Sequence, residues 1–507
     1  MLSALIWIPV LGAALIGFWP RPLTPKQSRL IALVVMGIAL IWTVVLGSQF
    51  DIGNPKLQFV EHLPWVESLG LTYQLGVDGL SLPLVALNSL LTLIAIYSTE
   101  KSVNRPRLYY ALVLLLNTGV AGAFLAQNLL LFFLFYELEL IPLYLLIAIW
   151  GGARRGYAAT KFLIYTAVSG ILILSAFLGL AWLSGSSTFD YEPLFAKALP
   201  LGQQFLLLGA LLVGFGIKIP LVPFHTWLPD AHVEASTPVS VLLAGVLLKL
   251  GTYGLLRFGL GLFPEAWAAL APGLATWAAV SVLYGAFTAI AQKDMKKMVA
   301  YSSIAHMGYV LLAAAAATPL SVLASMFQMI SHGLISALLF LLVGVVYQKT
   351  GTRDLDVLRG LLNPERGLPV IGSLMVLGVM ASAGIPGLVG FISEFLVFRG
   401  SLPAFPVQTL LCMIGTGLTA VYFLLLVNRA FFGRLSEQAL NLPPVQWFER
   451  TPAIVLAILI VILGLQPNWM VRWSESTTTA LIQTRSMSYQ ISAFAKRSDT
   501  VLQEYQQ

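Results

Sequence analysis

The stretch that decides the fold reads LGQQFLLLGALLVGFGIKIPLVPFHTWLPDAHVEASTPVSVLLAGVLLKLGTYGLLRFGL and runs from Leu201 to Leu260. It holds two apolar runs, each carrying one lysine, Lys218 and Lys249, with a more polar link between them. A lysine inside a membrane-length apolar run costs roughly 3 kcal/mol or more unless it faces water or a partner. We therefore interpret both lysines as functional. The alternative, snorkelling from helix ends to the membrane surface, would account for one of them.

The link after Lys218 begins with Pro220 and Pro223. Proline lacks a backbone N–H, so these residues predict that the helix breaks just after Lys218 and leaves carbonyls free, near 219–229. Broken backbone is tolerated at membrane depth only where it lines a cavity or is buried in protein. The link also contains ionisable side chains, namely His225, Asp230 and His232. This arrangement is typical of a relay for a small cation, most simply a proton.

The composition excludes several classes of protein. With 58% hydrophobic and 10% charged residues, the chain is predicted to be an integral, all-α membrane protein. Cys412 is the only cysteine, which excludes disulfides within the chain, Cys-ligated iron–sulfur clusters and thiolate zinc sites. We find no P-loop and no histidine pair of haem or metal type, and we expect no cofactor, no metal and no redox chemistry in this chain. The basic residues are spread among loops, so we expect no nucleic acid partner.

The chain contains about fourteen apolar segments long enough to span a membrane. They lie near 2–20, 28–49, 80–99, 108–126, 128–150, 158–184, 201–223, 236–260, 272–291, 298–316, 319–347, 369–398, 405–432 and 452–472. The odd-numbered connections hold nineteen Lys and Arg residues and the even-numbered ones four, with Arg257 among the four. This bias supports the number fourteen and places both termini on the side opposite the basic loops.

A second break is predicted at 384–387, within the run Ala383-Gly384-Ile385-Pro386-Gly387, and Glu394 lies about two turns beyond it. Two broken helices, each beside an intramembrane charge, indicate two inverted repeats. The predicted organisation has helices one to three at 1–107 with a connecting cap at 50–79, a first antiporter-like repeat at 108–260, a second at 272–432, and a last helix with a C-terminal tail at 452–507. We expect the tail to form an interfacial helix or a partner-docking segment.

Two glutamates, Glu137 and Glu139, lie inside an otherwise apolar helix. Two residues correspond to about 200° of rotation, so only one of them can meet Lys218 while the other faces a neighbouring helix or subunit. A lysine–carboxylate pair can pass between neutral and ionised forms when a nearby charge changes, although it can also be a purely structural ion pair. His306 and His332 lie in membrane segments beside hydroxyl side chains. Each suits a proton relay, or else a bond to a backbone carbonyl in the core.

These residues resemble those of the antiporter-like membrane subunits of respiratory complex I and of its photosynthetic relative, the NAD(P)H–quinone oxidoreductase of cyanobacteria and chloroplasts. The motifs that carry the resemblance are Glu137-Leu138-Glu139-Leu140-Ile141-Pro142, Lys218-Ile219-Pro220 through His232, Leu247-Leu248-Lys249, Tyr301 to Gly308, Ser331-His332-Gly333 and Gly390 to Phe395. The family shares this combination with subunits of multisubunit cation/proton antiporters. A subunit of a sodium/proton antiporter is therefore the alternative function.

The resemblance implies a proton relay in which Glu137 pairs with Lys218, Lys249 is the central lysine, and His306 and His332 lead to Glu394. Glu139 is similar to a glutamate of the photosynthetic branch and has no clear role. Quinone reduction, with plastoquinone, iron–sulfur clusters and NAD(P)H or ferredoxin, would take place in other subunits.

The resemblance also implies partners and a location. The partners would be other antiporter-like subunits of the same complex and membrane lipids, and the location a cyanobacterial thylakoid with both termini lumenal. The run Val233-Glu234-Ala235-Ser236-Thr237-Pro238 favours the variant that works with carbon-dioxide-uptake subunits.

Overall fold

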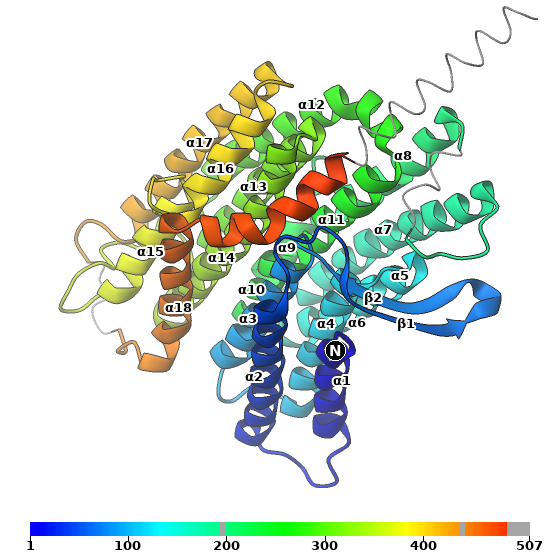
Figure 1. Cartoon of the computed structure of the whole chain (residues 1–507). Helices are drawn as coiled ribbons and strands as arrows, with labels where there is room; N and C mark the ends of the chain where they lie inside the picture. Colours follow the sequence, from blue (N-terminus) through cyan, green and yellow to red (C-terminus); the bar gives the residue numbers. More distant parts are fainter. Residues whose placement is uncertain (192–198, 436–441, 484–507) are drawn as a thin grey trace, which may run out of the picture.

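The computed structural model describes residues 1–191, 199–435 and 442–483, and these residues form a bundle of long helices with one β-hairpin at its side (Figure 1). The first half of the chain contains α1 (Ser3–Phe18), α2 (Pro25–Gln49), β1 (Gln58–Val66), η1 (Glu67–Leu69), β2 (Leu71–Val77), α3 (Leu82–Ser98), α4 (Pro106–Leu125), α5 (Leu129–Leu138), α6 (Leu140–Trp150), α7 (Arg155–Ser184), α8 (Leu201–Lys218) and α9 (Trp227–Glu234). The second half contains α10 (Thr237–Leu242), the π-helical turn η3 (Leu243–Leu247), α11 (Leu248–Gly254), the π-helical turn η4 (Leu255–Leu260), α12 (Pro264–Ile290), α13 (Met295–Ala316), α14 (Pro319–Thr350), α15 (Pro369–Ser382), α16 (Val389–Ser401), α17 (Pro406–Ala430) and α18 (Trp447–Leu465).

The prediction of an all-α, polytopic membrane protein is confirmed. Among the described residues, eleven helices are long and apolar enough to cross a membrane. Three further apolar helices, α1, α3 and α15, are shorter, at 10–17 residues, and are not counted among the eleven. Fourteen as an exact number of spans is therefore not confirmed. The division into repeats at 108–260 and 272–432 stays a prediction.

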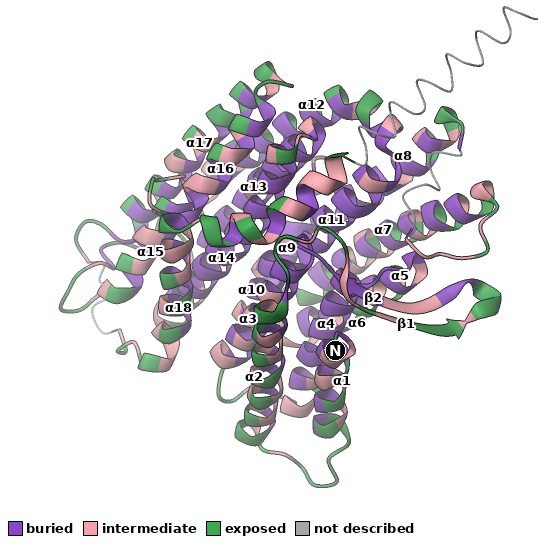
Figure 2. Cartoon of the chain, in the orientation of Figure 1, coloured by how far each residue is buried: buried purple, intermediate pink, exposed green. Residues whose placement is uncertain are grey.

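The helices at the centre of the bundle carry the polar residues of interest. The segment 238–260 is buried at every position, and most of α13 and α14 is buried as well. Figure 2 shows these helices in the buried colour, whereas much of α2, at the edge of the bundle, is exposed. In a membrane protein such outer apolar faces meet lipid or other subunits. Charges on the central helices are therefore held away from lipid.

Both predicted helix breaks are confirmed. Helix α8 ends at Lys218 and α9 begins at Trp227, while α15 ends at Ser382 and α16 begins at Val389. At the second break, Gly384 and Gly387 have φ angles of 70° and 92°, a left-handed backbone that favours glycine. The sequence did not predict a third interruption, at Glu139 between α5 and α6, nor the two π-helical turns beside α11.

The connection predicted as a folded cap at 50–79 contains the β-hairpin. Strands β1 and β2 pair antiparallel, with Gln58 opposite Val77 and Leu63 opposite Tyr73. The hairpin projects from the side of the bundle (Figure 1). Immediately after β2, the chain turns through Asp78 and Gly79 into α3.

The start of the predicted C-terminal tail is helical. Residues 468–483 form a helix that runs across the direction of the bundle helices, in orange-red in Figure 1. The Ser474 hydroxyl donates to the carbonyl of Gly79 at 2.7 Å, and the Gly79 N–H donates to Thr477 Oγ1 at 3.0 Å. This helix is therefore docked on the turn between the hairpin and α3. The rest of the predicted tail, 484–507, lies outside the described residues.

Substitution Gly79→Ala is expected to displace this C-terminal helix. A Cβ at position 79 would collide with the backbone carbonyl of Trp473 and would lie 3.0 Å from the Cα of Ser474. Overpacking of this kind costs about 1–3 kcal/mol. Limited proteolysis near the C-terminus and thermal unfolding should both report the change. Gly37→Ala on α2, where a Cβ meets nothing within 4 Å, is the matched control, and equal behaviour of the two variants would contradict the docking.

Candidate functional site

The first buried charge cluster lies where α8 ends. Lys218, the last residue of α8, donates to Glu139 Oε1, and the two side chains are 1% and 0% exposed. The ring of Tyr136 lies 4.9 Å from Lys218 Nζ and adds a cation–π contact. The break at Pro220 ends the helix here, so the lysine lies inside the protein at the end of a helix.

The prediction that Glu137 pairs with Lys218 is wrong. Glu139 lies between α5 and α6 and is the glutamate that contacts Lys218. The Glu137 carboxylate instead lies against Gly170 of α7, in a partly buried position. The two-residue spacing did predict that only one glutamate could reach the lysine. The sequence offered no signal for which of the two it would be.

The link after Lys218 forms its own contacts. Asp230 of α9 pairs with Lys161 of α7 at 2.7 Å, and both side chains are partly exposed. His225 packs edge-on against Tyr284 of α12, with ring centroids 4.8 Å apart. His232 stacks on Phe340 of α14 at 4.4 Å, and neither of its ring nitrogens has a hydrogen-bond partner within the described residues. Lys161 lies in the predicted segment 158–184, but nothing in the sequence singled it out as a partner of Asp230.

The second cluster is a series of contacts that starts at Lys249 on α11. Lys249 Nζ lies 2.7 Å from His332 Nδ1 of α14 and donates to the carbonyl of Ala244 at 2.5 Å. The rings of His332 and His306 have centroids 5.7 Å apart. His306 Nε2 in turn lies 3.5 Å from Glu394 Oε1 of α16. The structure thus brings together Lys249, His332, His306 and Glu394, as predicted for the relay, from four helices.

The contacts of the histidines and of Glu394 include groups that the sequence did not single out. His306 Nδ1 lies 2.7 Å from the carbonyl of Ser302, the bond expected of a core histidine. The Thr416 hydroxyl of α17 donates to Glu394 Oε2 at 2.8 Å. Glu394 is 3% exposed, so the Thr416 hydroxyl is one of the main polar contacts of its carboxylate.

A small cavity is lined by three of the four members of the second cluster. His306, His332 and Glu394 all line it, together with Gln328 and the hydroxyls of Ser302, Ser331, Ser336, Ser382 and Ser393. Gln328 Oε1 and His332 Nε2 are buried without a hydrogen-bond partner in the described part of the chain. Buried groups of this kind are satisfied by water where the cavity is polar. The lining therefore places hydroxyl and amide groups beside both rings, whose centroids lie 5.7 Å apart.

The two clusters are adjacent because α11 packs on the end of α8. A Cβ added to Gly251 of α11 would lie 3.1 Å from the Cβ of Lys218. Lys249 is two residues before Gly251 in the same helix. A glycine at this point lets the two lysine-bearing segments approach closely. The backbone segments that carry the two lysines therefore meet at Gly251.

Across residues 1–191, 199–435 and 442–483 no group of three or more His, Cys, Asp and Glu side chains could hold a metal ion.

Comparisons with known proteins agree with this geometry. The family described as "NADH:quinone oxidoreductase/Mrp antiporter, TM" matches residues 126–419. NAD(P)H-quinone oxidoreductase chain 4 1 of Synechococcus sp. (strain JA-3-3Ab) is 43% identical over 95% of this chain and 92% of its own. This chain belongs to the NAD(P)H-quinone oxidoreductase chain 4 family. A second chain 4 relative, from Thermosynechococcus vestitus, is 40% identical over 95% of this chain and 91% of its own.

Solved structures extend the comparison of this chain 4 family member. A chain of respiratory complex I from Thermus thermophilus superimposes with a TM-score of 0.85 at 28% identity, covering 95% of this chain and 99% of that one. A chain of the Mrp complex from Dietzia sp. shares the fold, with a TM-score of 0.82 at 21% identity, over 96% of this chain and 98% of that one. The predicted resemblance to the antiporter-like subunits of complex I is confirmed, and the oxidoreductase function is supported over the sodium/proton antiporter.

Proposed function

We propose that the chain translocates protons in the membrane arm of an NAD(P)H- or ferredoxin-dependent plastoquinone oxidoreductase. The observation that carries the proposal is the buried series from Lys249 through His332 and His306 to Glu394, beside the Lys218–Glu139 pair. Intramembrane ionisable residues are costly and are retained for function. A series of them that crosses four helices is the arrangement a proton path requires.

The two lysines have different environments, and this difference suggests how the path works. Lys218 has a carboxylate partner, Glu139, whereas within the described part of the chain Lys249 has only a carbonyl and an imidazole. When Lys218 leaves Glu139, its uncompensated positive charge repels the proton on Lys249. His332 Nδ1 lies within the distance at which a proton can pass. The proton then moves by way of the cavity to His306 and Glu394.

The energy source lies elsewhere in the complex. We propose that this chain holds no cofactor or metal, and that plastoquinone, the iron–sulfur clusters and NAD(P)H or ferredoxin are bound by other subunits. The complex I and Mrp structures that this chain resembles are multisubunit assemblies, which supports neighbours of the antiporter-like type.

The location and the variant are also proposals. The cyanobacterial relatives support a thylakoid membrane, and the bias of basic residues supports lumenal termini. The run 233–238 is the sole support for carbon-dioxide-uptake partners. Purification of the tagged chain from separated thylakoid and plasma membranes tests both. Recovery from the thylakoid fraction supports the location, and co-purified carbon-dioxide-uptake subunits, beside the iron–sulfur subunits of the oxidoreductase, support the variant.

His306→Gln is expected to abolish the proton translocation of this subunit while quinone reduction and assembly continue. Glutamine can still form hydrogen bonds, but it cannot take up and release a proton at neutral pH. The ratio of protons translocated to electrons transferred, measured in vesicles, should fall. His62→Gln, on the exposed part of the hairpin, is the matched control. A ratio unchanged from wild type in the His306 variant would exclude this histidine from the path.

A further inference from the structure

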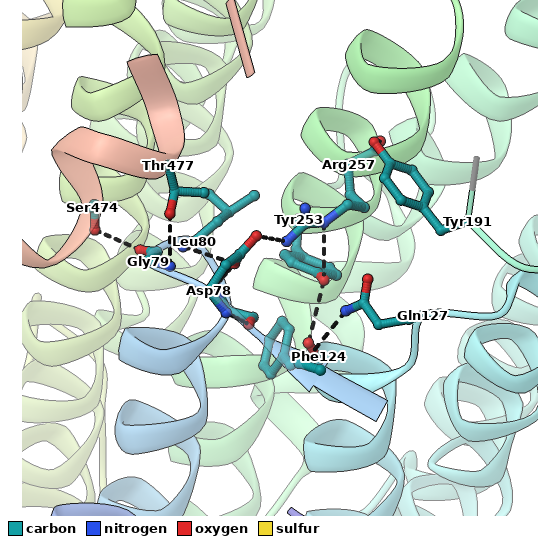
Figure 3. Close-up of polar contacts among 12 residues, drawn as sticks. Asp78, Gly79, Leu80, Phe124, Gln127, Tyr191, Tyr253, Arg257, Ser474 and Thr477 are labelled. Atoms are coloured by element: carbon teal, nitrogen blue, oxygen red, sulfur yellow. Dashed lines mark hydrogen bonds and ion pairs between the residues drawn. The ribbon is translucent and has the colours of Figure 1, made fainter. Parts of the chain in front are cut away.

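A third buried charge cluster, which the proposed path does not use, lies at the junction of the hairpin, α3 and the C-terminal helix (Figure 3). Asp78 Oδ2 accepts from Arg257 Nη2 at 2.5 Å, and the side chains are 3% and 8% exposed. The other carboxylate oxygen, Oδ1, accepts from the N–H groups of Leu80 and Ser81, both at 3.0 Å. The sequence had placed Arg257 in a loop and Asp78 in the cap. The structure instead places the arginine inside η4.

The cluster is attached to the helix of the central lysine. Lys249, Tyr253 and Arg257 are spaced by four residues, a spacing that puts successive side chains on neighbouring parts of one helix face. The Tyr253 hydroxyl accepts from Arg257 Nε at 3.2 Å and donates to the carbonyl of Phe124 on α4, also at 3.2 Å. Figure 3 shows these groups converging from separate elements. Tyr253 and Arg257, which follow Lys249 in the chain, thus restrain the rotation of α11 about its axis.

The backbone on both sides of α11 makes such a restraint necessary. The π-helical turns η3 and η4 flank α11, so its seven residues are offset in register from the segments before and after it. At one end, Lys249 donates to the carbonyl of Ala244 in η3 at 2.5 Å. At the other end, the carbonyl of Arg257 in η4 accepts from the Tyr191 hydroxyl at 3.2 Å. The geometry of η4 is therefore held by side chains from outside the helix.

We propose that Asp78, Arg257 and Tyr253 are positioning residues that hold Lys249 within reach of His332. This inference rests on the proposed proton path and adds to it. Proton transfer requires the 2.7 Å contact between Lys249 Nζ and His332 Nδ1, and a displacement of about 1 Å is enough to lower a rate by two orders of magnitude. An ion pair used only for stability could be replaced by apolar side chains at little cost. Here the extra hydrogen bonds of the pair join the turn before α3, at Leu80 and Ser81, to Tyr253 of α11.

The experiment uses the intact complex in vesicles and measures the ratio of protons translocated to electrons transferred. In Tyr253→Phe the ion pair remains, but both contacts of the hydroxyl are lost. We expect an assembled complex with normal quinone reduction and a reduced ratio. In Arg257→Gln, the ratio of protons to electrons should fall by the whole contribution of this subunit. Arg257→Lys keeps the charge and should restore part of that contribution. If the complex with Arg257→Gln fails to assemble, the ratio of protons to electrons in Tyr253→Phe still tests the inference.

The control is a buried ion pair of similar exposure that does not contact α11. Lys349 and Glu449 join α14 to α18 at 2.8 Å, with side chains 8% and 6% exposed. Glu449→Gln should lower stability and leave the ratio unchanged. A wild-type ratio in assembled Tyr253→Phe and Arg257→Gln would overturn the inference. A wild-type ratio in Lys249→Met would instead overturn the proposed path itself, so the two failures are distinguishable.

Discussion

Replacement of Lys218 by methionine is expected to abolish proton translocation by this chain and also to destabilise it. The substitution leaves Glu139, which is fully buried, without its cation. Removing one partner of a buried ion pair costs about 3–5 kcal/mol, because the remaining charge is uncompensated. Thermal unfolding of the purified complex measures the stability, and the ratio of protons to electrons in vesicles measures the function.

A double substitution separates these two effects. Lys218→Met combined with Glu139→Leu removes both charges and replaces them with apolar side chains of similar size. Such replacements of buried ion pairs are often neutral or stabilising. The double variant should therefore recover stability and still translocate no protons. Recovery of proton translocation together with stability would show that the pair is only structural.

The two glutamates provide an internal control for the first prediction. Glu139→Gln removes the carboxylate that accepts from Lys218, whereas Glu137→Gln changes a partly buried side chain beside Gly170. The structure predicts the larger loss of stability for Glu139→Gln. A larger loss of stability for Glu137→Gln would instead support the pairing of Glu137 with Lys218 that was first inferred from the sequence.

Replacement of Lys249 by methionine is the second prediction with a large effect, and its expected signature is different. Proton translocation should again be lost, because the series to His332 loses its first member. Stability should change less than in Lys218→Met. Lys249 has no carboxylate partner among the described residues, so the variant leaves two unpaired neutral groups, at about 1–3 kcal/mol each, and no buried charge. Removal of a costly buried ammonium offsets part of that loss.

The matched control for Lys249 is another buried lysine. Lys296 is 4% exposed and donates to the carbonyl of Ala235 at 2.6 Å, outside the proposed series. Lys296→Met should have a similar effect on stability and none on the ratio of protons to electrons. Equal loss of the ratio in both variants would indicate that any buried lysine in this region supports the complex, and would contradict a specific path.

The sequence by itself determined the class of protein, both broken helices and most of the buried ionisable residues of which the proposed path is made. Long apolar runs, prolines after Lys218 and the glycine–proline run before Glu394 act locally, so the sequence reports them directly. Burial of lysine, histidine and glutamate inside such runs is costly enough to be read as function without a structure.

Only the tertiary structure decided which of these side chains meet. The pairing of Lys218 with Glu139, rather than with Glu137, and the two π-helical turns beside Lys249 have no distinct pattern in a single sequence. Asp78 and Arg257 are 179 residues apart and were both read as loop residues. Contacts between distant segments arise from how whole helices pack, and local residue preferences do not encode them.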